Sequence, residues 1–489
     1  MNYYVGIDIG TSSAKLLLIN SQGNIIKSSS RSYDIIENTA GCKEIEPETW
    51  MYAIKQALSE LLCDIDTMKI ASIGVTGQMH TVVFLDENGN SIRPALMWND
   101  TRTASMLAEV KQNISNIKQV NYIANIISTG SPAINLLWLK QNEPEHFSKI
   151  KKFLIAPDYI VYRLTGQYQT DYCEASTSSM CDLKKSKWSS EIRELFGFSE
   201  EIFPEIKGAG ETAGILLEKY QKKYHLNSNV NVIVGTGDNP AAAIATGCLS
   251  KNYPVLSLGT SGVLMFPREH IALQAKGKNI LFSIDGKPIS VLVQGVVQSC
   301  GNSLSWWIEK IQQTKDYDKE TENIDIAHLG ESSVIFYPHI TGEKTIYANP
   351  NLKGCFIEIG TDVTRKDMTL AVMEGICFAI KQLAEAMNIS VEKLSDLHVT
   401  GGGAKNEIWM QILADILNTS VLQMESNTGA GYGIALIAAA SVTKDFSIEQ
   451  IVEQTIKRRF FPREYNAKLY AEKYKKYINI YEALQKIKK

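Results

Sequence analysis

Two Gly-Thr-Ser segments in this chain have the residue types that a phosphate-binding turn requires. Gly10-Thr11-Ser12 follows the apolar run Tyr4–Ile9, and Gly259-Thr260-Ser261 follows the apolar run Val255–Leu258. Each turn offers backbone N–H groups and two hydroxyls in a small space, which suits phosphate oxygens. One such turn alone is more often an ordinary hairpin. Two turns, each at the start of one half of the chain, indicate an internal repeat whose loops face one cleft.

An aspartate precedes the first turn inside its apolar strand. Asp8 is flanked by Ile7 and Ile9, and an unpaired buried carboxylate is too costly to leave without a partner. One reading is that Asp8 caps nearby backbone amides. The other is that it coordinates Mg²⁺, directly or through water, beside nucleotide phosphates.

A second aspartate ends another apolar strand. Asp238 follows Val232–Gly237 and precedes Asn239-Pro240 and three alanines. An aspartate in that place is commonly a helix N-cap. The functional alternative is the base that orients a substrate hydroxyl and accepts its proton during phosphoryl transfer.

Two further segments mix polar and apolar side chains in a way that suits a polyhydroxylated ligand. Met79 and His80 follow the strand end at Gly77, and Trp98, Asn99 and Asp100 follow Arg93-Pro94. Sugar hydroxyls need fixed hydrogen-bonding partners, and the C–H face of a sugar needs an apolar one. From the residues alone, plain core packing remains an equally open reading.

Other nucleotide-binding patterns are missing or incomplete. The P-loop pattern GxxxxGK[ST] does not occur in the sequence. A GxGxxA string does occur at 208–213, but no strand-like run precedes it, so we expect a surface loop there.

The elements that must position these residues alternate between apolar strands and amphipathic helices, which predicts an α/β protein. One helix should start at Pro47, another should follow Gly403, and the Lys-rich C-terminal segment should form a surface helix. The apolar positions that predict them are Trp50, Ile54, Leu58 and Leu61; Trp409, Ile412, Leu413, Ile416 and Leu417; and Tyr470, Tyr474, Tyr477, Ile480 and Leu484.

The composition is that of an ordinary globular protein of two or three domains. The 489 residues are 44% hydrophobic and 21% charged, with a formal net charge of −3. A near-neutral balance argues against a nucleic-acid or membrane-surface partner. The eight cysteines form no CxxC pair, and no apolar run approaches the roughly 18 residues of a membrane span. These features predict a cytoplasmic protein with reduced thiols.

Seven motifs, in order, resemble the FGGY carbohydrate kinases over nearly the full length, and most of all the xylulokinases among them. The motifs are Gly6-Ile-Asp-Ile-Gly-Thr-Ser-Ser13, Gly77-Gln-Met-His80, Arg93-Pro-Ala-Leu-Met-Trp-Asn-Asp100, Gly235-Thr-Gly-Asp-Asn239, Ser257-Leu-Gly-Thr-Ser-Gly262, Pro338-His-Ile-Thr-Gly-Glu-Lys-Thr345 and Gly401-Gly-Gly-Ala-Lys-Asn406. The resemblance implies an α/β, two-domain, actin-like (ribonuclease H-like) ATPase fold with the active site in the interdomain cleft. Residues 1–247 would bind the sugar and carry the base, and residues 248–489 would bind the nucleotide.

The resemblance also implies a role for each motif residue. Asp238 would be the catalytic base, and Asp8 would be the acidic residue near Mg²⁺ and the γ-phosphate of ATP. The expected phosphate and nucleoside contacts are Thr11, Ser12, Gly259, Thr260, Gly402, Gly403 and Asn406. The expected sugar contacts are Met79, His80, Trp98, Asn99, Asp100 and Asn239.

Three departures from the common pattern concern the substrate. Thr81 replaces a usual Gly, Lys344 stands where the family usually has Arg, and Tyr432 is bulkier than its usual counterpart. The sequence therefore predicts an ATP-dependent ketose kinase, with D-xylulose as the first choice of acceptor. Gluconate, another pentulose or a polyol is the alternative acceptor, and a non-catalytic ATP switch or sugar sensor is the alternative class. The oligomeric state stays open, with a homodimer among the options.

Overall fold

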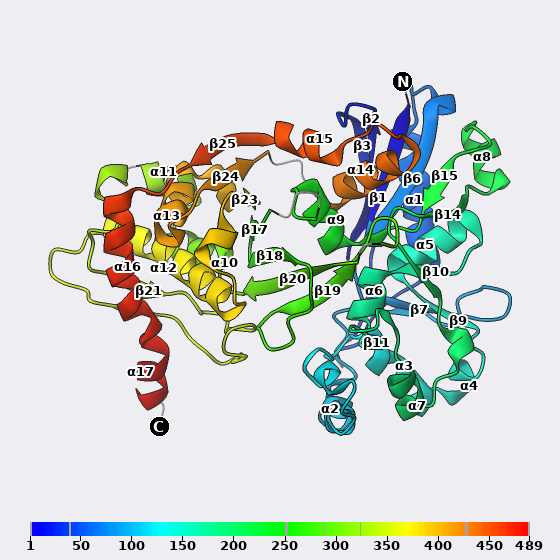
Figure 1. Ribbon diagram of the computed structural model, residues 1–489, viewed down its shortest axis with the longest axis horizontal. Helices are drawn as coiled ribbons and strands as arrows, with labels where there is room; N and C mark the ends of the chain where they lie inside the picture. Colours follow the sequence, from blue (N-terminus) through cyan, green and yellow to red (C-terminus); the bar gives the residue numbers. More distant parts are fainter. Residues whose placement is uncertain are drawn as a thin grey trace.

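The structure is a computed structural model that describes residues 2–38, 41–249, 253–287, 289–322, 324–425 and 429–487. Two seven-stranded sheets dominate it, one in each half of the chain (Figure 1). The first contains β1 (Tyr3–Ile9), β2 (Ser13–Asn20), β3 (Ile25–Ser32), β6 (Ile70–Gly77), β14 (Thr212–Ile215), β15 (Asn231–Ile233) and β16 (Thr236–Gly237). The second contains β17 (Val255–Leu258), β18 (Gly262–Arg268), β19 (Lys278–Phe282), β20 (Ser290–Val297), β23 (Leu397–Thr400), β24 (Val421–Met424) and β25 (Ile456–Phe460).

Smaller sheets and the helices complete the fold. A five-stranded sheet is formed by β4 (Ile36–Glu37), β5 (Lys43–Ile45), β7 (Val82–Leu85), β8 (Ala95–Leu96) and β9 (Lys152–Ile155). The strand pairs are β10 (Gln169–Asp171) with β13 (Glu205–Lys207), β11 (Cys181–Asp182) with β12 (Lys187–Trp188), and β21 (Ile335–Tyr337) with β22 (Cys355–Ile357). The helices are α1 (Pro47–Leu61), α2 (Leu107–Ser115), α3 (Pro132–Asn142), α4 (Pro144–Phe147), α5 (Ala156–Thr165), α6 (Tyr172–Thr177), α7 (Ser190–Phe196), α8 (Glu218–Tyr224), α9 (Asp238–Ala245), α10 (Gly301–Ser305), α11 (Tyr317–Glu322), α12 (Arg365–Ala386), α13 (Glu407–Leu417), α14 (Ala430–Val442), α15 (Ile448–Gln454), α16 (Glu464–Ile478) and α17 (Ile480–Ile487).

The two large sheets begin in the same way, which confirms the internal repeat. β1 pairs antiparallel with β2 and parallel with β6. In the second half, β17 pairs antiparallel with β18 and parallel with β23. In both halves the parallel neighbour ends in a glycine loop, after Gly77 in one and at Gly401 in the other. The repeat therefore brings four loops to corresponding strand ends, two in each half.

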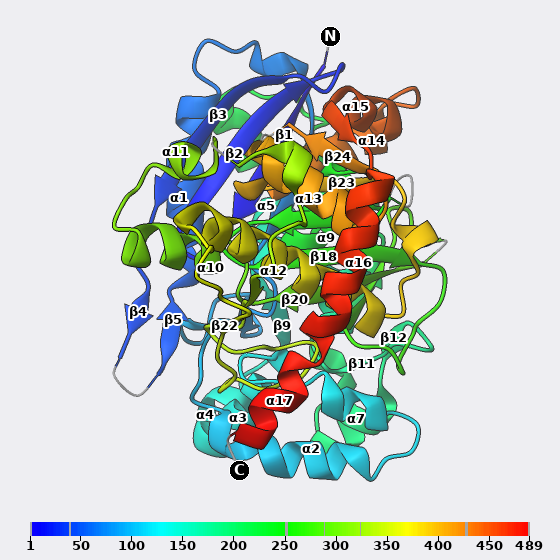
Figure 2. The ribbon, with the colours of Figure 1, turned by 90° about the vertical axis from the view of Figure 1, so that its left-hand side faces the viewer.

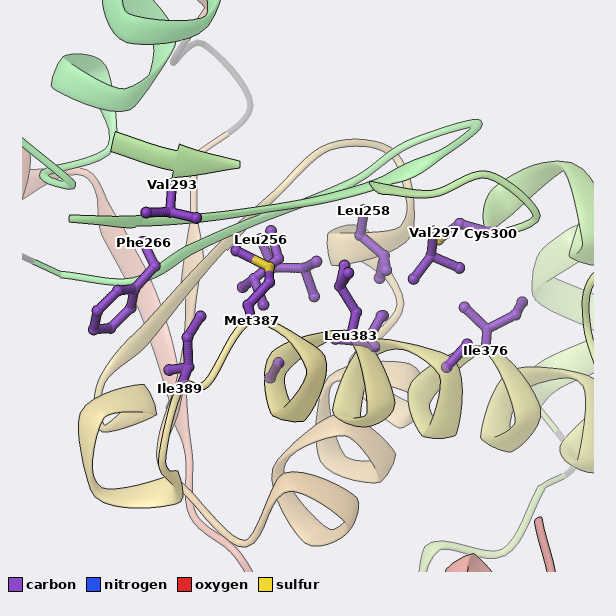
Figure 3. Close-up of a cluster of buried hydrophobic side chains, with 14 of the residues drawn as sticks. Leu256, Leu258, Phe266, Val293, Val297, Cys300, Ile376, Leu383, Met387 and Ile389 are labelled. Carbon is purple, nitrogen blue, oxygen red and sulfur yellow. The ribbon is translucent and has the colours of Figure 1, made fainter. Parts of the chain in front are cut away.

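The core of the second half lies between its sheet and α12. Side chains from the strands, such as Leu256, Leu258 and Val297, face Ile376 and Leu383 of this long helix (Figure 3). All five are at most 1% exposed. Because interiors are packed as densely as organic crystals, this contact fixes the strands that carry the second Gly-Thr-Ser turn.

The three predicted helices are present, and their apolar faces are buried. α1 begins at Pro47, and α13 begins after its N-cap Asn406. The C-terminal segment forms α16 and α17, which run down the outside of the second half (Figure 2). Tyr470, Tyr474 and Tyr477 of α16 pack on Phe378 of α12, so its tyrosine face joins the core. Lys473 of the same helix is also buried, in an ion pair with Glu374.

One helix of the second half packs against the first sheet. α14 covers β1 and β6 and lies beside α9 (Figure 1). Glycines make this close approach possible: a Cβ at Gly6 would lie 2.1 Å from the oxygen of Gly431, and one at Gly433 would lie 1.8 Å from the oxygen of Ala241. Tyr432 lies between these two glycines of α14 in sequence, and its hydroxyl donates to the oxygen of Gly23 at 2.8 Å. The unusual Tyr432 thus contacts a surface turn of the first half.

The division of the chain at 247/248 remains a prediction. Residues 250–252, next to that point, lie outside the described residues. The helix α14 shows that any such division separates sequence halves whose elements are interleaved in space.

The expectation of a surface loop at 208–213 was wrong. Gly208 and Ala209 are buried between the two halves, and the N–H groups of Ala209 and Gly210 donate to the oxygens of Ser283 and Ile284 at 2.8 and 2.7 Å. The glycines allow this backbone contact, since a Cβ at Gly208 would lie 2.3 Å from the nitrogen of Gly286.

In the described part of the chain, no helix combines the length and apolarity needed to cross a membrane.

Candidate active site

The first Gly-Thr-Ser turn is a tight hairpin connection between β1 and β2. The N–H of Gly10 donates to the oxygen of Ser13 at 2.9 Å, and the oxygen of Ser12 accepts from the N–H of Tyr33 at 3.0 Å. The hydroxyl of Thr11 accepts a hydrogen bond from the Trp98 indole at 3.2 Å. Ser12 is exposed, so the turn is held rigidly while its tip stays open to a ligand.

The second turn repeats this geometry between β17 and β18, where Leu258 pairs with Gly262. Its carbonyls are held by the start of α10: the N–H of Gly301 donates to the oxygen of Gly259, and that of Asn302 to the oxygen of Thr260, both at 3.0 Å. A Cβ at Gly301 would lie 2.4 Å from the oxygen of Gly259. Thr260 at the tip of this turn is exposed, as Ser12 is in the first turn.

Asp8 and Asp238 belong to one electrostatic site. Asp8 lies on β1, beside Lys15 on β2 and Thr76 on β6. Burial raises the pKa of Asp8 to about 6, although the charge of Lys15 opposes this rise. Burial, and after it the charge of Asp8, raises the pKa of Asp238 to about 7. A carboxyl group with that pKa is suited to exchange a proton near neutral pH.

Asp238 is not the N-cap of α9, as one reading of the sequence expected. Gly237 is the N-cap of α9, and Asp238 is the first residue of the helix. The same glycine also makes room for the neighbouring loop, because a Cβ there would lie 2.5 Å from Cγ of Met79. Asp238 is therefore next to the loop predicted to contact the sugar.

Met79, His80 and Asn239 form one cluster beside Asp238. The amide nitrogen of Asn239 lies 3.6 Å from Sδ of Met79. His80 has a φ of 71°, a conformation that costs a residue with a side chain and is found often at functional sites. Burial lowers the pKa of His80 well below its usual value, with the charges of Lys278 and Lys344 acting in the same direction. The imidazole is therefore neutral at physiological pH.

The segment from Trp98 to Asp100 divides into an exposed part and a buried part. Trp98 is 45% exposed and bonds to Thr11, so it links the predicted sugar segment to the first phosphate turn. Asp100 is 0% exposed, and its carboxylate accepts from the N–H of Lys43 at 2.7 Å and pairs with Arg102 at 2.8 Å. Asp100 thus supports the segment from inside. Asn99 has a buried side-chain oxygen that finds no hydrogen-bond partner in the described part of the chain.

Thr81 also supports this segment. It is fully buried, and its hydroxyl accepts from the N–H of Trp98 at 3.1 Å. The departure from glycine at this position therefore adds a hydrogen bond that fixes Trp98.

In the glycine loop that follows β23, one glycine is open to its surroundings and the next is packed against side chains. A Cβ at Gly402 would meet no atom of the described residues within 4 Å, whereas one at Gly403 would lie 2.8 Å from the side chains of Leu258 and Trp409. Asn406 caps α13 by accepting from the N–H of Trp409 at 2.9 Å, and its amide donates to the hydroxyl of Thr321 at 2.9 Å. Of the three, Gly402 offers backbone that a ligand can approach.

Sequence reasoning missed several residues of this site. Lys278 and Gln294 come from β19 and β20 of the second half and contact His80 and Asn239 at 3.0 and 3.2 Å. Glu174 on α6 is buried, and among the described residues neither of its carboxylate oxygens has a hydrogen-bond partner. Burial, with the charges of Asp158, Asp171 and Asp238, raises its pKa well above the usual value. In the sequence, Lys278 follows Gly277 and precedes a short apolar run, but nothing in the sequence connects it to His80.

Two family models match the chain, one over residues 3–245 and one over residues 255–442. They are the N-terminal and C-terminal domains of the FGGY family of carbohydrate kinases. The chain belongs to this family. It is an ATP-dependent sugar kinase, as the motifs predicted.

Individual relatives match this FGGY kinase from end to end. A xylulose kinase of Staphylococcus xylosus is 32% identical over 484 residues, covering 99% of this chain and 100% of the relative. A xylulose kinase of Bacillus subtilis is also 32% identical, covering 98% and 97%. The crystal structure of a xyloylose kinase from Brucella ovis superposes with a TM-score of 0.89 at 28% identity, covering 99% and 100%. The predicted actin-like fold is confirmed by this agreement.

Proposed function

We propose that this kinase transfers the γ-phosphoryl group of ATP to a hydroxyl of D-xylulose, which gives D-xylulose 5-phosphate. The full-length relatives named as xylulose kinases support this acceptor. The observation that carries the chemistry is Asp238, which begins α9 next to Met79 and has a pKa of about 7. The roles assigned to the site residues below are part of the proposal.

Asp238 orients the acceptor hydroxyl and takes its proton as the oxygen attacks the γ-phosphorus. Because the transition state of phosphoryl transfer is loose, orientation comes first and proton acceptance comes late. Met79, His80 and Asn239 hold the sugar beside Asp238, with Trp98 along its apolar face. The turns at 10–12 and 259–261 hold the phosphates through backbone N–H groups and the Thr11 and Thr260 hydroxyls.

Residues of the site fit a magnesium ion that arrives with the nucleotide. Mg²⁺ is usually bound by one or two carboxylates together with substrate phosphates and water. Asp8 supplies such a carboxylate: it is partly buried, and its charge raises the pKa of Asp238. No group of three or more His, Cys, Asp or Glu side chains that could hold a metal occurs among the described residues. The ion would neutralise charge on the phosphates that Asp8 faces.

The nucleoside would lie against the second half, near Gly402 and Asn406. Sugar and nucleotide then approach from opposite halves, with the first half carrying the base. Exclusion of water when both are bound would limit the wasteful hydrolysis of ATP.

The test is an acceptor screen with the full chain. ADP release is measured with ATP, Mg²⁺ and one of D-xylulose, D-ribulose, gluconate or glycerol, together with a sample that lacks any acceptor. We expect the highest kcat/KM with D-xylulose and ADP release that depends on the acceptor. A higher kcat/KM with gluconate or glycerol would overturn the assignment of the sugar, and release independent of any acceptor would overturn kinase chemistry at Asp238.

A further inference from the structure

Two side chains of the second half reach into the sugar-contacting cluster of the first half. Lys278 Nζ lies 3.0 Å from Nε2 of His80, and the amide of Asn239 donates to Oε1 of Gln294 at 3.2 Å. Lys278 and Gln294 are directly opposite each other on the antiparallel strands β19 and β20. A single cross-strand pair therefore contacts two of the residues expected to bind the acceptor.

β19 is fixed to the first half by its own backbone. The N–H of Leu281 donates to the hydroxyl of Ser176 on α6 at 3.0 Å. Just beyond β19, the oxygens of Ser283 and Ile284 accept from Ala209 and Gly210. This strand is the edge of the second sheet, yet its hydrogen bonds hold it against the first half. These hydrogen bonds therefore hold Lys278 beside His80.

The Lys278–His80 contact determines which nitrogen of the imidazole carries the proton. An ammonium group can only donate hydrogen bonds, so Nε2 of His80 must accept. A neutral imidazole then carries its proton on Nδ1, which becomes a donor. Without Lys278 the ring would be free to adopt the other tautomer, and the donor would point elsewhere.

The charges around Lys278 show why a cation is tolerated there. Burial lowers its pKa to about 8, and the charge of Lys344 acts in the same direction, while Cys173, Glu174 and Asp238 oppose this shift. At pH 7 Lys278 therefore remains mostly charged, close to Asp238 and to the buried carboxyl group of Glu174.

We propose that Lys278 is a positioning residue of the acceptor site: it fixes His80 as a neutral ring that donates from Nδ1 to a sugar oxygen. Gln294 does the same for Asn239 by fixing the orientation of its amide. The acceptor specificity of this kinase thus depends on a strand pair from the half that binds the nucleotide. The proposal rests on the proposed sugar kinase activity and names residues that determine its affinity for the acceptor.

The test is Lys278→Met in the full-length protein, with Lys276→Met as the matched control. Lys276 is two residues earlier and exposed. With whichever acceptor the wild type uses best, we expect the KM for the acceptor to rise by about 10- to 100-fold in Lys278→Met, as for loss of a hydrogen bond to a charged group. The KM for ATP should stay within about twofold, and Lys276→Met should match the wild type in both. Lys278→Arg, which keeps the donors, should recover part of the loss.

A double-mutant cycle with His80→Ala separates positioning from simple packing. If Lys278 acts through His80, Lys278→Met should have little further effect on the acceptor KM in the His80→Ala background. Additive effects of the two substitutions would overturn the proposal, and so would an unchanged acceptor KM in a Lys278→Met protein with wild-type thermal stability. A wild type that phosphorylates no acceptor would instead refute the sugar kinase activity itself.

Discussion

Asp238 at the start of α9 is influenced by Asp8 on β1, because the charge of Asp8 adds to burial in raising the pKa of Asp238 to about 7. The first strand of the fold and the helix that ends the first half thus contribute two like charges to one site. Like charges at close range are tolerated when a proton or a cation compensates them. In the proposed phosphoryl transfer, a proton would compensate the charge of Asp238 and a cation would compensate that of Asp8.

Replacement of Asp238, the proposed base, should separate catalysis from stability. In Asp238→Asn we expect kcat for sugar phosphorylation to fall by about 10²- to 10⁴-fold, the usual contribution of a general base. ATP affinity should stay within about twofold, because the phosphate turns are untouched. The measurements are coupled ADP release and ATP binding by calorimetry; sugar phosphorylation retained at the wild-type rate would exclude Asp238 as the base.

Thermal unfolding of Asp238→Asn provides a control, because the direction of the change in unfolding temperature can be predicted. The pKa of Asp238 is raised from 3.8 to about 7 in the folded protein. A carboxyl group that binds its proton more tightly when folded costs the protein stability as the pH rises from about 4 to about 7. Asp238→Asn should therefore unfold at the same temperature as the wild type, or at a higher one, at pH 8. A lower unfolding temperature would indicate a structural role.

The pH dependence of the wild type should report the same carboxyl group. The proposed base Asp238 would be active only when deprotonated, so kcat/KM for the sugar should fall about tenfold per pH unit below its pKa, which is about 7 without a bound cation. A divalent cation near Asp8 favours the charged form, so the acidic limb should move to lower pH as Mg²⁺ is raised. An acidic limb at the same pH from limiting to saturating Mg²⁺ would place the cation away from Asp8.

Two adjacent glycines of the loop after β23, which we propose to contact the nucleotide, should respond differently to alanine. At Gly402 a Cβ would meet nothing within 4 Å in the part of the chain that the structure describes, and the φ of −61° at this position suits alanine. Gly402→Ala should therefore keep the wild-type unfolding temperature while raising the KM for ATP several-fold, because the new methyl group occupies the ligand side. At Gly403 a Cβ would lie 2.8 Å from Leu258 and Trp409, so Gly403→Ala should lower stability by about 1–3 kcal/mol. Gly402→Ala with an unchanged KM for ATP would mean that the nucleotide does not approach this backbone.

The sequence could predict the features that depend on local pattern and repetition. Periodicity predicted α1, α13 and a C-terminal surface helix with its tyrosines on one face, and the repeated Gly-Thr-Ser strands predicted the matching sheets. It could not predict contacts made between the halves. The burial of Gly208 and Ala209 depends on backbone hydrogen bonds to Ser283 and Ile284, and these leave no local pattern.

Within the site, residue types predicted where a residue lies better than they predicted whether its side chain is free to contact a ligand. Asp238 and Met79 lie together as the motifs implied. Asp100 has the right type for sugar binding, but Arg102, two residues later, occupies its carboxylate. Lys278 went unnoticed because its partner His80 is almost two hundred residues earlier in the chain.

The packing of α14 on the first half should be the most sensitive point of the fold. At Gly433 a Cβ would lie 1.8 Å from the backbone oxygen of Ala241, and neither helix can move without disturbing β1 or Asp238. Gly433→Ala should therefore lower the free energy of unfolding by about 3 kcal/mol or more and reduce kcat together with it. Gly431, one half-turn away, is the matched control: a Cβ there would make an ordinary 3.4 Å contact with Asp8. Because alanine favours helix over glycine by about 0.5–1 kcal/mol, Gly431→Ala should be neutral or stabilising in chemical denaturation. Equal losses in both variants would mean that glycine is needed throughout this turn of α14 and that the contact with Ala241 has no special part.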